Sequence, residues 1–227
     1  MSEFLYCLYD LDGTLTESAP GITRCVQYAL EGLGIHEPDL AKLETFVGPP
    51  LGDEFRRRYH LSDSQCLFAI DRYRERYRET GIFECTLYPG IRELLSAQAA
   101  AGQHLAVASS KPEAFVRQIC EHFSIAQYFS EICGAPMDEE KQGTGGKTSK
   151  ELVVERALQG LGVLSDPERK ARTAMVGDRC FDVQGALSNG VIPVGVTYGY
   201  GTRKELEQAG CTRIAEDAGA LGRILLF

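Results

Sequence analysis

The sequence predicts an α/β fold in which a doubly wound parallel sheet is interrupted after its first strand by an inserted all-α cap. Three features of the chain support this prediction. Residues 4–9 form a short apolar run with the length and bounds of a buried strand. The next segment, residues 16–85, shows helical patterns and no convincing strand. From residue 87 onward, apolar runs alternate with helical patterns, which is typical of parallel βαβ units.

In the first half of the chain, amphipathic spacing and helix end signals predict a series of helices. A helix over residues 20–34 has Pro20 in its first turn and ends at Gly34. Proline favours the first turn of a helix, and glycine favours the position where a helix ends. The adjacent Pro49 and Pro50 must interrupt any helix. We therefore expect helices at residues 20–34, 38–46, 52–60 and 62–80.

The alternating part of the chain supplies the remaining predicted elements. We expect strands at residues 104–108, 131–133, 173–176 and 192–196. We expect helices at residues 89–101, 112–122, 148–161, 181–188 and 218–226. The resulting division assigns residues 1–15 and 86–227 to the core and residues 16–85 to the cap.

Composition limits the classes of partner. Of the 227 residues, 44% are hydrophobic, which is enough to bury a sizeable core. The formal net charge of −8 argues against a nucleic acid polymer or an anionic membrane as the main partner. We find no apolar run of membrane-spanning length and no signal peptide. The eight cysteines show no Cys-x-x-Cys pair, so we expect reduced thiols and a cytoplasmic location.

Two aspartates lie at the end of the first predicted strand, where Asp10 and Asp12 flank Leu11 and precede Gly13. The carboxyl ends of parallel strands form the edge at which open α/β sheets bind ligands. Two carboxylates held this close repel each other unless a cation lies between them or one takes a proton. One aspartate is therefore a candidate metal ligand and nucleophile, and the other a candidate proton shuttle. The alternative is an ordinary turn with solvated acids.

Polar residues follow two later strands and are expected at the same edge. Ser109 and Ser110 follow residues 104–108 and offer a hydroxyl and backbone N–H groups to a phosphate, although a serine there can also cap a helix. Asp178 follows residues 173–176, and Asp182 lies where it can favour a helix N-terminus. An acid cluster at a sheet edge needs a cation, and oxygen ligands point to Mg²⁺.

A lysine near the start of the helix at residues 148–161 completes the candidate site. A cation there opposes the helix dipole, and balancing a phosphate and carboxylates is one reason for its presence. Lys147 and Lys150 are the two candidates, and at least one of them is a solvated surface lysine.

The segment from Tyr198 to Gly201 follows the last predicted strand and is expected near the same edge. It alternates tyrosine with glycine, so we expect a flexible loop. It is either a rim of the site or an ordinary turn.

Together these residues closely resemble the motifs of the haloacid dehalogenase superfamily, specifically its phosphatases with a helical cap inserted after the first motif. The matching segments are residues 10–15 for the first motif, Ser109 for the second, and residues 177–182 for the fourth. The third motif departs from the pattern, because the Lys-Pro pair that many relatives have at that motif is absent there. Spacing to the apolar residues that follow favours Lys150 over Lys147.

The resemblance implies an enzyme, a Mg²⁺-dependent phosphatase that acts on a small phosphorylated metabolite. It implies that Asp10 is the nucleophile, which forms an aspartyl-phosphate, and that Asp12 is the acid/base. It also implies Mg²⁺ ligation by Asp10, Asp178 and the backbone carbonyl of Asp12. We expect Ser109, Ser110 and Lys150 to hold the phosphate, and Asp182 and Arg179 to orient the ligands.

The cap segment from Gly48 to Leu51 and the fourth motif look most like phosphoglycolate phosphatases or 5′-nucleotidases. The first class is our main prediction. The alternatives are a 5′-nucleotidase acting on nucleoside monophosphates and a sugar phosphomutase of the same fold. The sequence contains no signal for an oligomeric state.

Overall fold

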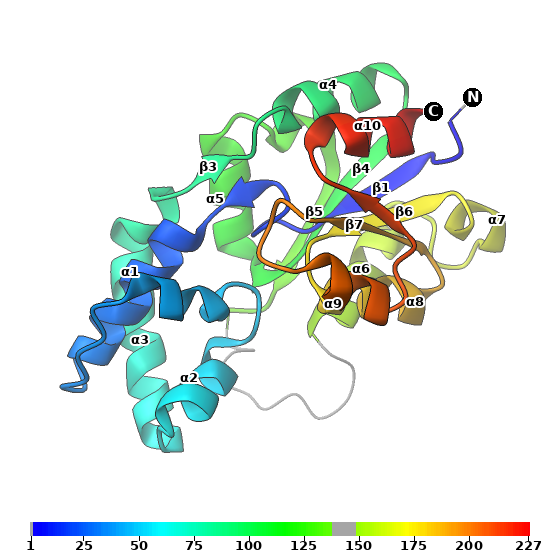
Figure 1. Ribbon diagram of the computed structural model, residues 1–227. Helices are drawn as coiled ribbons and strands as arrows, with labels where there is room; N and C mark the ends of the chain where they lie inside the picture. The colour runs from blue at the N-terminus through cyan, green and yellow to red at the C-terminus, as the bar shows by residue number, and fades with distance from the viewer. Residues whose placement is uncertain (1, 138–148) are drawn as a thin grey trace.

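The computed structural model describes residues 2–137 and 149–227 (Figure 1). These residues form a six-stranded parallel sheet with the strand order β5-β4-β1-β6-β7-β8. Its strands are β1 (Tyr6–Tyr9), β4 (His104–Pro112), β5 (Phe129–Ala135), β6 (Thr173–Gly177), β7 (Ile192–Val196) and β8 (Arg213–Ala215). The predicted α/β class with a parallel sheet is confirmed.

Strand β1 lies in the middle of the sheet, and its alternating side chains build the core on both faces. Cys7 and Tyr9 pack with helices α4 (Ile91–Ala100), α5 (Glu113–His122) and α10 (Ala218–Leu226) on one face. Tyr6 and Leu8 pack with α6 (Ser149–Gly160) and α8 (Cys180–Asn189) on the other face. Because successive side chains of a strand point to opposite faces, a short apolar run serves both layers.

The register of the central strands determines which residues meet at the carboxyl edge. Tyr9 lies opposite Val107 on one side and Val176 on the other. The segments that follow these three residues therefore leave the sheet at the same level. The backbone N–H of Asp10 donates to the Val176 carbonyl at 2.9 Å, which continues this register by one residue.

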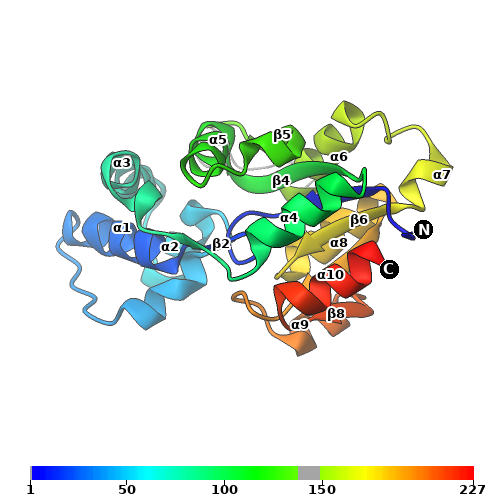
Figure 2. The same ribbon diagram turned by 90° about the horizontal axis from the view of Figure 1, so that it is seen from above.

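A group of helices lies to one side of the sheet, as Figures 1 and 2 show. It contains α1 (Ala19–Glu31), α2 (Leu51–Tyr59), α3 (Asp63–Glu79) and the short 3₁₀ helices η1 (Leu40–Phe46) and η2 (Gly81–Phe83). We call this group the helical insert. Helix η1 ends at Phe46 and α2 begins at Leu51, so the predicted break at Pro49 and Pro50 is present. The domain boundaries at residues 15 and 86 stay a prediction.

One expectation for this region is wrong. Residues 16–85 were expected to lack a strand, but β2 (Thr16–Glu17) pairs antiparallel with β3 (Thr86–Leu87). Two-residue strands are too short to produce an alternating pattern, so periodicity misses them. The pair joins the two chain segments that connect the sheet to the helical insert.

The remaining differences concern short elements and element ends. The sequence pattern missed α7 (Pro167–Lys170), α9 (Arg203–Gln208), β8 and the 3₁₀ helix η3 (Ala126–Tyr128). Strand β4 runs on to Pro112, beyond the predicted end at residue 108. Among the described residues, no helix is both long and apolar enough to cross a membrane.

Candidate active site

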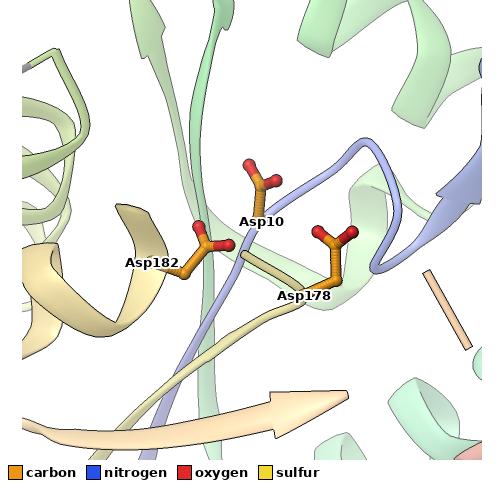
Figure 3. A group of neighbouring side chains, drawn as sticks. All are labelled: Asp10, Asp178 and Asp182. Atoms are coloured by element: carbon orange, nitrogen blue, oxygen red, sulfur yellow. The ribbon is translucent and has the colours of Figure 1, made fainter. Parts of the chain in front are cut away.

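Three buried carboxylates meet at the carboxyl edge of the sheet. Asp10 follows β1, Asp178 follows β6, and Asp182 lies in the first turn of α8. One carboxylate oxygen from each lies within 4.8 Å of the others. Figure 3 shows the three side chains gathered around a common space. The predicted meeting of Asp10 and Asp178 therefore takes place, and Asp182, expected only to orient the ligands, belongs to the same group.

Burial makes the negative charge of this cluster costly. It raises the pKa of Asp10 to about 6, opposed by the Lys150 ammonium and reinforced by the Asp182 carboxylate. Burial also raises the pKa of Asp178 well above its usual range, and the charges of Asp182 and Asp10 add to this effect. The Tyr200 N–H, which donates to Asp178 Oδ2 at 2.7 Å, acts in the opposite direction.

Lys150 supplies the positive charge nearest to these acids. Its Nζ lies 2.6 Å from Asp10 Oδ1 and 2.8 Å from Asp182 Oδ1, and it donates to the Ala108 carbonyl at 3.0 Å. Burial alone would lower the pKa of Lys150, but the charges of Asp10 and Asp182 outweigh it and raise that pKa. Lys147, the other candidate, lies outside the described residues.

Asp182 has two contacts that explain its position. Its Oδ2 accepts a hydrogen bond from the Arg179 N–H at 3.0 Å, which caps the start of α8, while Oδ1 faces Lys150. Asp182 therefore caps the helix N-terminus with one carboxylate oxygen and belongs to the acid cluster through the other. The sequence signal for Asp182 is its position four residues after Asp178. This spacing puts Asp182 in the first turn of α8, close to the strand end that Asp178 follows.

Asp12 pairs with a lysine that the sequence analysis did not assign to the site. Lys111 Nζ lies 2.5 Å from Asp12 Oδ2, and both side chains are buried. Burial alone would lower the pKa of Lys111, but the Asp12 charge outweighs it and raises that pKa. The sequence signal that could identify Lys111 as a site residue is its position. It directly follows Ser109 and Ser110 at the same strand end.

Ser109 is buried within β4 and does not cap a helix. The residue at the N-cap of α5 is Pro112, whose side chain has no capping hydrogen bond. Ser109 Oγ instead accepts the Lys111 N–H at 3.3 Å. Ser109 and Ser110 both line a cavity of about 170 Å³, together with Asp10, Asp12 and Lys150. The hydroxyl and the carboxylates thus face the same space.

Arg179, which we expect to orient the acids, contacts the acid cluster through its backbone while its side chain has other partners. Its guanidinium pairs with Glu205 at 2.9 Å and donates to the Val47 carbonyl at 3.1 Å. Only its backbone N–H contacts an acid of the cluster, Asp182. The side chain extends toward the helical insert because Glu205, on α9, holds it there. A pattern within one motif contains no information on this distant partner.

The turn after Asp12 requires glycine for two reasons. Gly13 has a φ of +83°, which side chains disfavour. A Cβ at this position would also overlap the Asp178 carboxylate. The close approach of the β1 and β6 segments therefore depends on the missing side chain.

The donor set fits a hard divalent cation. Asp178 Oδ1 is buried and has no hydrogen-bond partner within the described ranges 2–137 and 149–227. Buried polar atoms normally have a partner, so an unpartnered carboxylate oxygen beside two further carboxylates is a natural cation ligand. Asp10, Asp178 and Asp182 supply only oxygen atoms, which suits Mg²⁺ better than a soft transition metal.

The helical insert supplies the opposite wall of the cavity. Its contribution includes the loop Gly48–Pro49–Pro50, with Phe46 and Tyr73 beside it. Phe181 and Arg179 approach from the side of the sheet. The insert also contributes the charged residues Asp53, Arg56 and Arg74, so the cavity has charged groups on both sides and aromatic surface near the insert.

Comparison with known proteins identifies relatives across nearly the whole chain. A family model described as haloacid dehalogenase-like hydrolase matches residues 7–196. The crystal structure of a predicted phosphatase from Clostridium acetobutylicum superimposes with a TM-score of 0.87 at 42% identity, covering 97% of each chain. The similarity therefore extends through both the sheet and the helical insert.

Three proteins illustrate the range of named relatives. The chain is 42% identical to a 5′-nucleotidase of Pseudomonas aeruginosa, over 96% of this chain and 94% of that protein. It is 39% identical to the tyrosine-protein kinase PtkA of Mycobacterium tuberculosis, over 93% of this chain and 68% of that protein. It is 30% identical to a phosphoglycolate phosphatase of Neisseria meningitidis, over 95% of this chain and 90% of that protein.

Proposed function

Because this chain belongs to the haloacid dehalogenase-like hydrolases, we propose that it is a Mg²⁺-dependent phosphatase that cleaves a small phosphate monoester through an aspartyl-phosphate. Its class, a phosphoric monoester hydrolase, follows from the family and from the phosphatase and nucleotidase relatives. The observation that carries the finer proposal is the meeting of Asp10, Asp178 and Asp182 beside the Lys150 ammonium.

In the proposed first step, a carboxylate oxygen of Asp10 attacks the phosphorus and the bond to the ester oxygen breaks. Asp12 donates its proton to the departing oxygen. In the second step, Asp12 takes a proton from a water molecule whose oxygen attacks the phosphorus. The bond to Asp10 then breaks, which releases inorganic phosphate and restores the carboxylate.

The lysines have distinct proposed roles. Lys150 neutralises phosphate charge beside the nucleophile in this proposal, and its contact with Asp10 supports the role. Ser109 and Ser110 line the same cavity and offer hydrogen-bond donors to the phosphate oxygens. Lys111 holds the Asp12 carboxylate in place through its 2.5 Å contact, which restricts the direction from which Asp12 exchanges its proton.

We assign the cation to Asp10, Asp178 and the Asp12 backbone carbonyl, with Asp182 as a neighbouring carboxylate. When bound, Mg²⁺ offsets the repulsion between an anionic nucleophile and an anionic phosphate and stabilises charge in the transition state. The chain supports this assignment with buried acids whose ionised forms are costly without a counter-charge.

We further propose that residues 16–85 act as a cap that limits access to the site, with residues 1–15 and 86–227 as the catalytic core. The wall formed by the insert supports this role, because it faces the strand ends across the cavity. Such caps exclude water and select the leaving group.

Two substrate classes are the leading candidates. Phosphoglycolate agrees with one named relative, and a nucleoside monophosphate agrees with another of higher identity. The cavity lining offers two kinds of contact to a leaving group, the aromatic rings of Phe46 and Phe181 and the guanidinium groups of Arg56 and Arg74. The aromatic rings suit the base of a nucleoside monophosphate and the guanidinium groups suit the carboxylate of phosphoglycolate, so both substrates are tested.

The deciding experiment measures phosphate release from a panel of monoesters, with Mg²⁺ and with excess chelator. The panel contains phosphoglycolate, nucleoside monophosphates and sugar phosphates, ranked by kcat/KM. We expect release that depends on Mg²⁺. Release that persists in chelator would overturn the metal assignment, and dependence on a bisphosphate activator would indicate a phosphomutase.

A parallel incubation with ATP addresses the kinase-named relative. The chain is incubated with ATP and analysed by mass spectrometry for phosphate on tyrosine. We expect no stable phosphotyrosine, because in the proposed second step Asp12 activates the water that removes the phosphate. Stoichiometric phosphotyrosine without phosphate release would contradict the proposed hydrolase.

A further inference from the structure

One residue of the loop after β7 touches both an acid of the site and the start of the helical insert. The Tyr200 N–H donates to Asp178 Oδ2 at 2.7 Å. Its phenolic oxygen accepts the N–H groups of Ser18 at 2.9 Å and Ala19 at 2.8 Å. The catalytic steps described above do not use this residue.

The start of α1 depends on this distant contact. Ser18 is the N-cap residue of α1, yet its side chain makes no capping hydrogen bond. The first N–H groups of a helix have no partner within the helix and need one from elsewhere. Tyr200 supplies it from 182 residues further along the chain.

The contact lies at the junction between the sheet and the insert. Helix α1 begins just after β2, and β2 pairs with β3 where the chain returns from the insert. Tyr88, immediately after β3, packs its ring against Tyr198 with centroids 4.8 Å apart. The loop after β7 therefore contacts both connecting segments.

The same loop is held tightly against Asp178. A Cβ at Gly199 would overlap the Gly13 carbonyl, and a Cβ at Gly201 would overlap the Asp178 carbonyl. The backbone on both sides of Tyr200 thus lies directly on the first and fourth motifs. Close-packed groups transmit strain, so this packing provides a physical link between the Tyr200 ring and the Asp178 carboxylate.

We propose that Tyr200 is a positioning residue that couples the placement of the helical insert to the Asp178 carboxylate. The proposal rests on the proposed function, in which Asp178 is a Mg²⁺ ligand. Coupling between two sites is reciprocal, so an insert held correctly at α1 strengthens Mg²⁺ binding, and bound Mg²⁺ stabilises that placement. The phenolic hydroxyl acts through its hydrogen bonds to α1 and does not itself contact the acids.

The test compares Tyr200→Phe with wild type in the full chain. The substitution removes the hydroxyl and keeps both the ring and the N–H that contacts Asp178. Mg²⁺ affinity is obtained from the rise of Tm with Mg²⁺ concentration. We expect Mg²⁺ binding to weaken by about five-fold or more, the lower range of coupling between sites. Saturating Mg²⁺ should restore most of the lost phosphate release from p-nitrophenyl phosphate.

Tyr198→Phe is the matched control. It removes a hydroxyl from the same loop, but this hydroxyl donates to the Thr14 carbonyl at 3.0 Å and does not cap α1. We expect Tyr198→Phe to keep the wild-type Mg²⁺ affinity. Far-UV circular dichroism and Tm without Mg²⁺ establish that both variants fold.

The outcomes separate this inference from the proposed function. If wild type binds Mg²⁺ and releases phosphate, but Tyr200→Phe only lowers Tm and keeps its Mg²⁺ affinity, the coupling is wrong and the tyrosine is purely structural. If both variants lose affinity equally, the effect is not specific to the α1 contact and the inference also fails. If wild type neither binds Mg²⁺ nor releases phosphate, the proposed function itself fails.

Discussion

At the scale of single residues, the site is a balance between buried charges of opposite sign. Asp10 and Asp182 share the Lys150 ammonium, while Asp12 has its own lysine, Lys111. Asp178 has a backbone N–H as its partner and no cation of its own within the part of the chain that the structure describes. This imbalance explains why the Asp178 side of the cluster is where we place Mg²⁺.

Asp10→Asn tests the nucleophile. The amide keeps the shape of the side chain but cannot form the aspartyl-phosphate, so we expect turnover to disappear while Tm stays near or above the wild-type value. Steady-state phosphate release and thermal unfolding measure the two effects. Asp166→Asn, at the start of α7, is the control and should keep full activity. Measurable turnover in pure Asp10→Asn would remove Asp10 from its proposed role.

Asp12→Ala tests the acid/base. We expect kcat to fall by about a hundredfold or more, which is the usual contribution of a positioned acid/base group. The loss should be smaller for substrates whose leaving group is already acidic, such as p-nitrophenyl phosphate, because protonation of the departing oxygen matters less. An equal loss for p-nitrophenyl and alkyl phosphates would argue against this role.

At the scale of elements, strand ends and the first turns of helices bring the groups together: Asp10 and Asp178 follow strands, while Lys150 and Asp182 lie in the first turns of α6 and α8. The Gly13 turn lets β1 and β6 deliver their acids to one place, and Arg179 connects the start of α8 to the insert through the Val47 carbonyl. The helices mainly bury apolar surface and hold these turns at the sheet edge.

Gly13→Ala separates backbone strain from steric overlap. Gly34 has a similar positive φ of +75°, but a Cβ there meets no atom within 4 Å. We expect Gly34→Ala to cost about 1–2 kcal/mol, the cost of a left-handed conformation for a residue with a side chain. Gly13→Ala should cost clearly more and weaken Mg²⁺ binding, because its Cβ displaces Asp178. Denaturant unfolding measures the loss of stability in each variant, and Mg²⁺ titration measures the loss of affinity. Equal losses in Gly13→Ala and Gly34→Ala would disprove the steric overlap with Asp178.

Arg179→Met tests the contact with the insert. Loss of the bond to the Val47 carbonyl should loosen the loop that lines the cavity, so we expect KM to rise several-fold with a smaller change in kcat. Arg203→Met on α9 removes an exposed ion pair with Glu216 and should leave KM unchanged. A fall in kcat with constant KM would instead favour the original expectation that Arg179 orients the acids.

At the scale of the whole molecule, stability depends on the charge state of the site. Asp10 and Asp178 have raised pKa values in the folded protein, Asp10 at about 6, against about 3.9 for an unfolded aspartate. The folded state therefore binds more protons than the unfolded state in this range. By linkage, the free energy of unfolding of the metal-free protein falls as pH rises through about 6.

Thermal unfolding in chelator and in Mg²⁺ over this pH range tests the linkage. We expect Tm in chelator to decrease as pH rises, and the gain from Mg²⁺ to increase, because ionised carboxylates bind the cation. Subtracting the Tm curve in chelator from the Tm curve in Mg²⁺ removes the contribution of groups that titrate equally in both conditions. Asp178→Asn should flatten this difference, and a gain from Mg²⁺ that does not vary with pH would contradict the account.

Local sequence patterns were sufficient for the parts of the molecule that repeat a simple period. Apolar runs located β1, β4, β6 and β7, and the edge they share followed from the geometry of parallel strands, so Asp10 and Asp178 were expected to meet. The short β2 and β3 and the small helices α7 and α9 were missed, because they contain too few residues to show a period.

The α/β class, the order of the main elements and the acids at the strand ends can be predicted from the chain alone, since they depend on local periodicity and on residues adjacent in the chain. The pairing of Lys111 with Asp12, the direction of Arg179 toward the insert and the contact of Tyr200 with the start of α1 emerge only in the folded protein. These contacts join side chains whose directions depend on packing between distant segments, and no local pattern encodes such a direction.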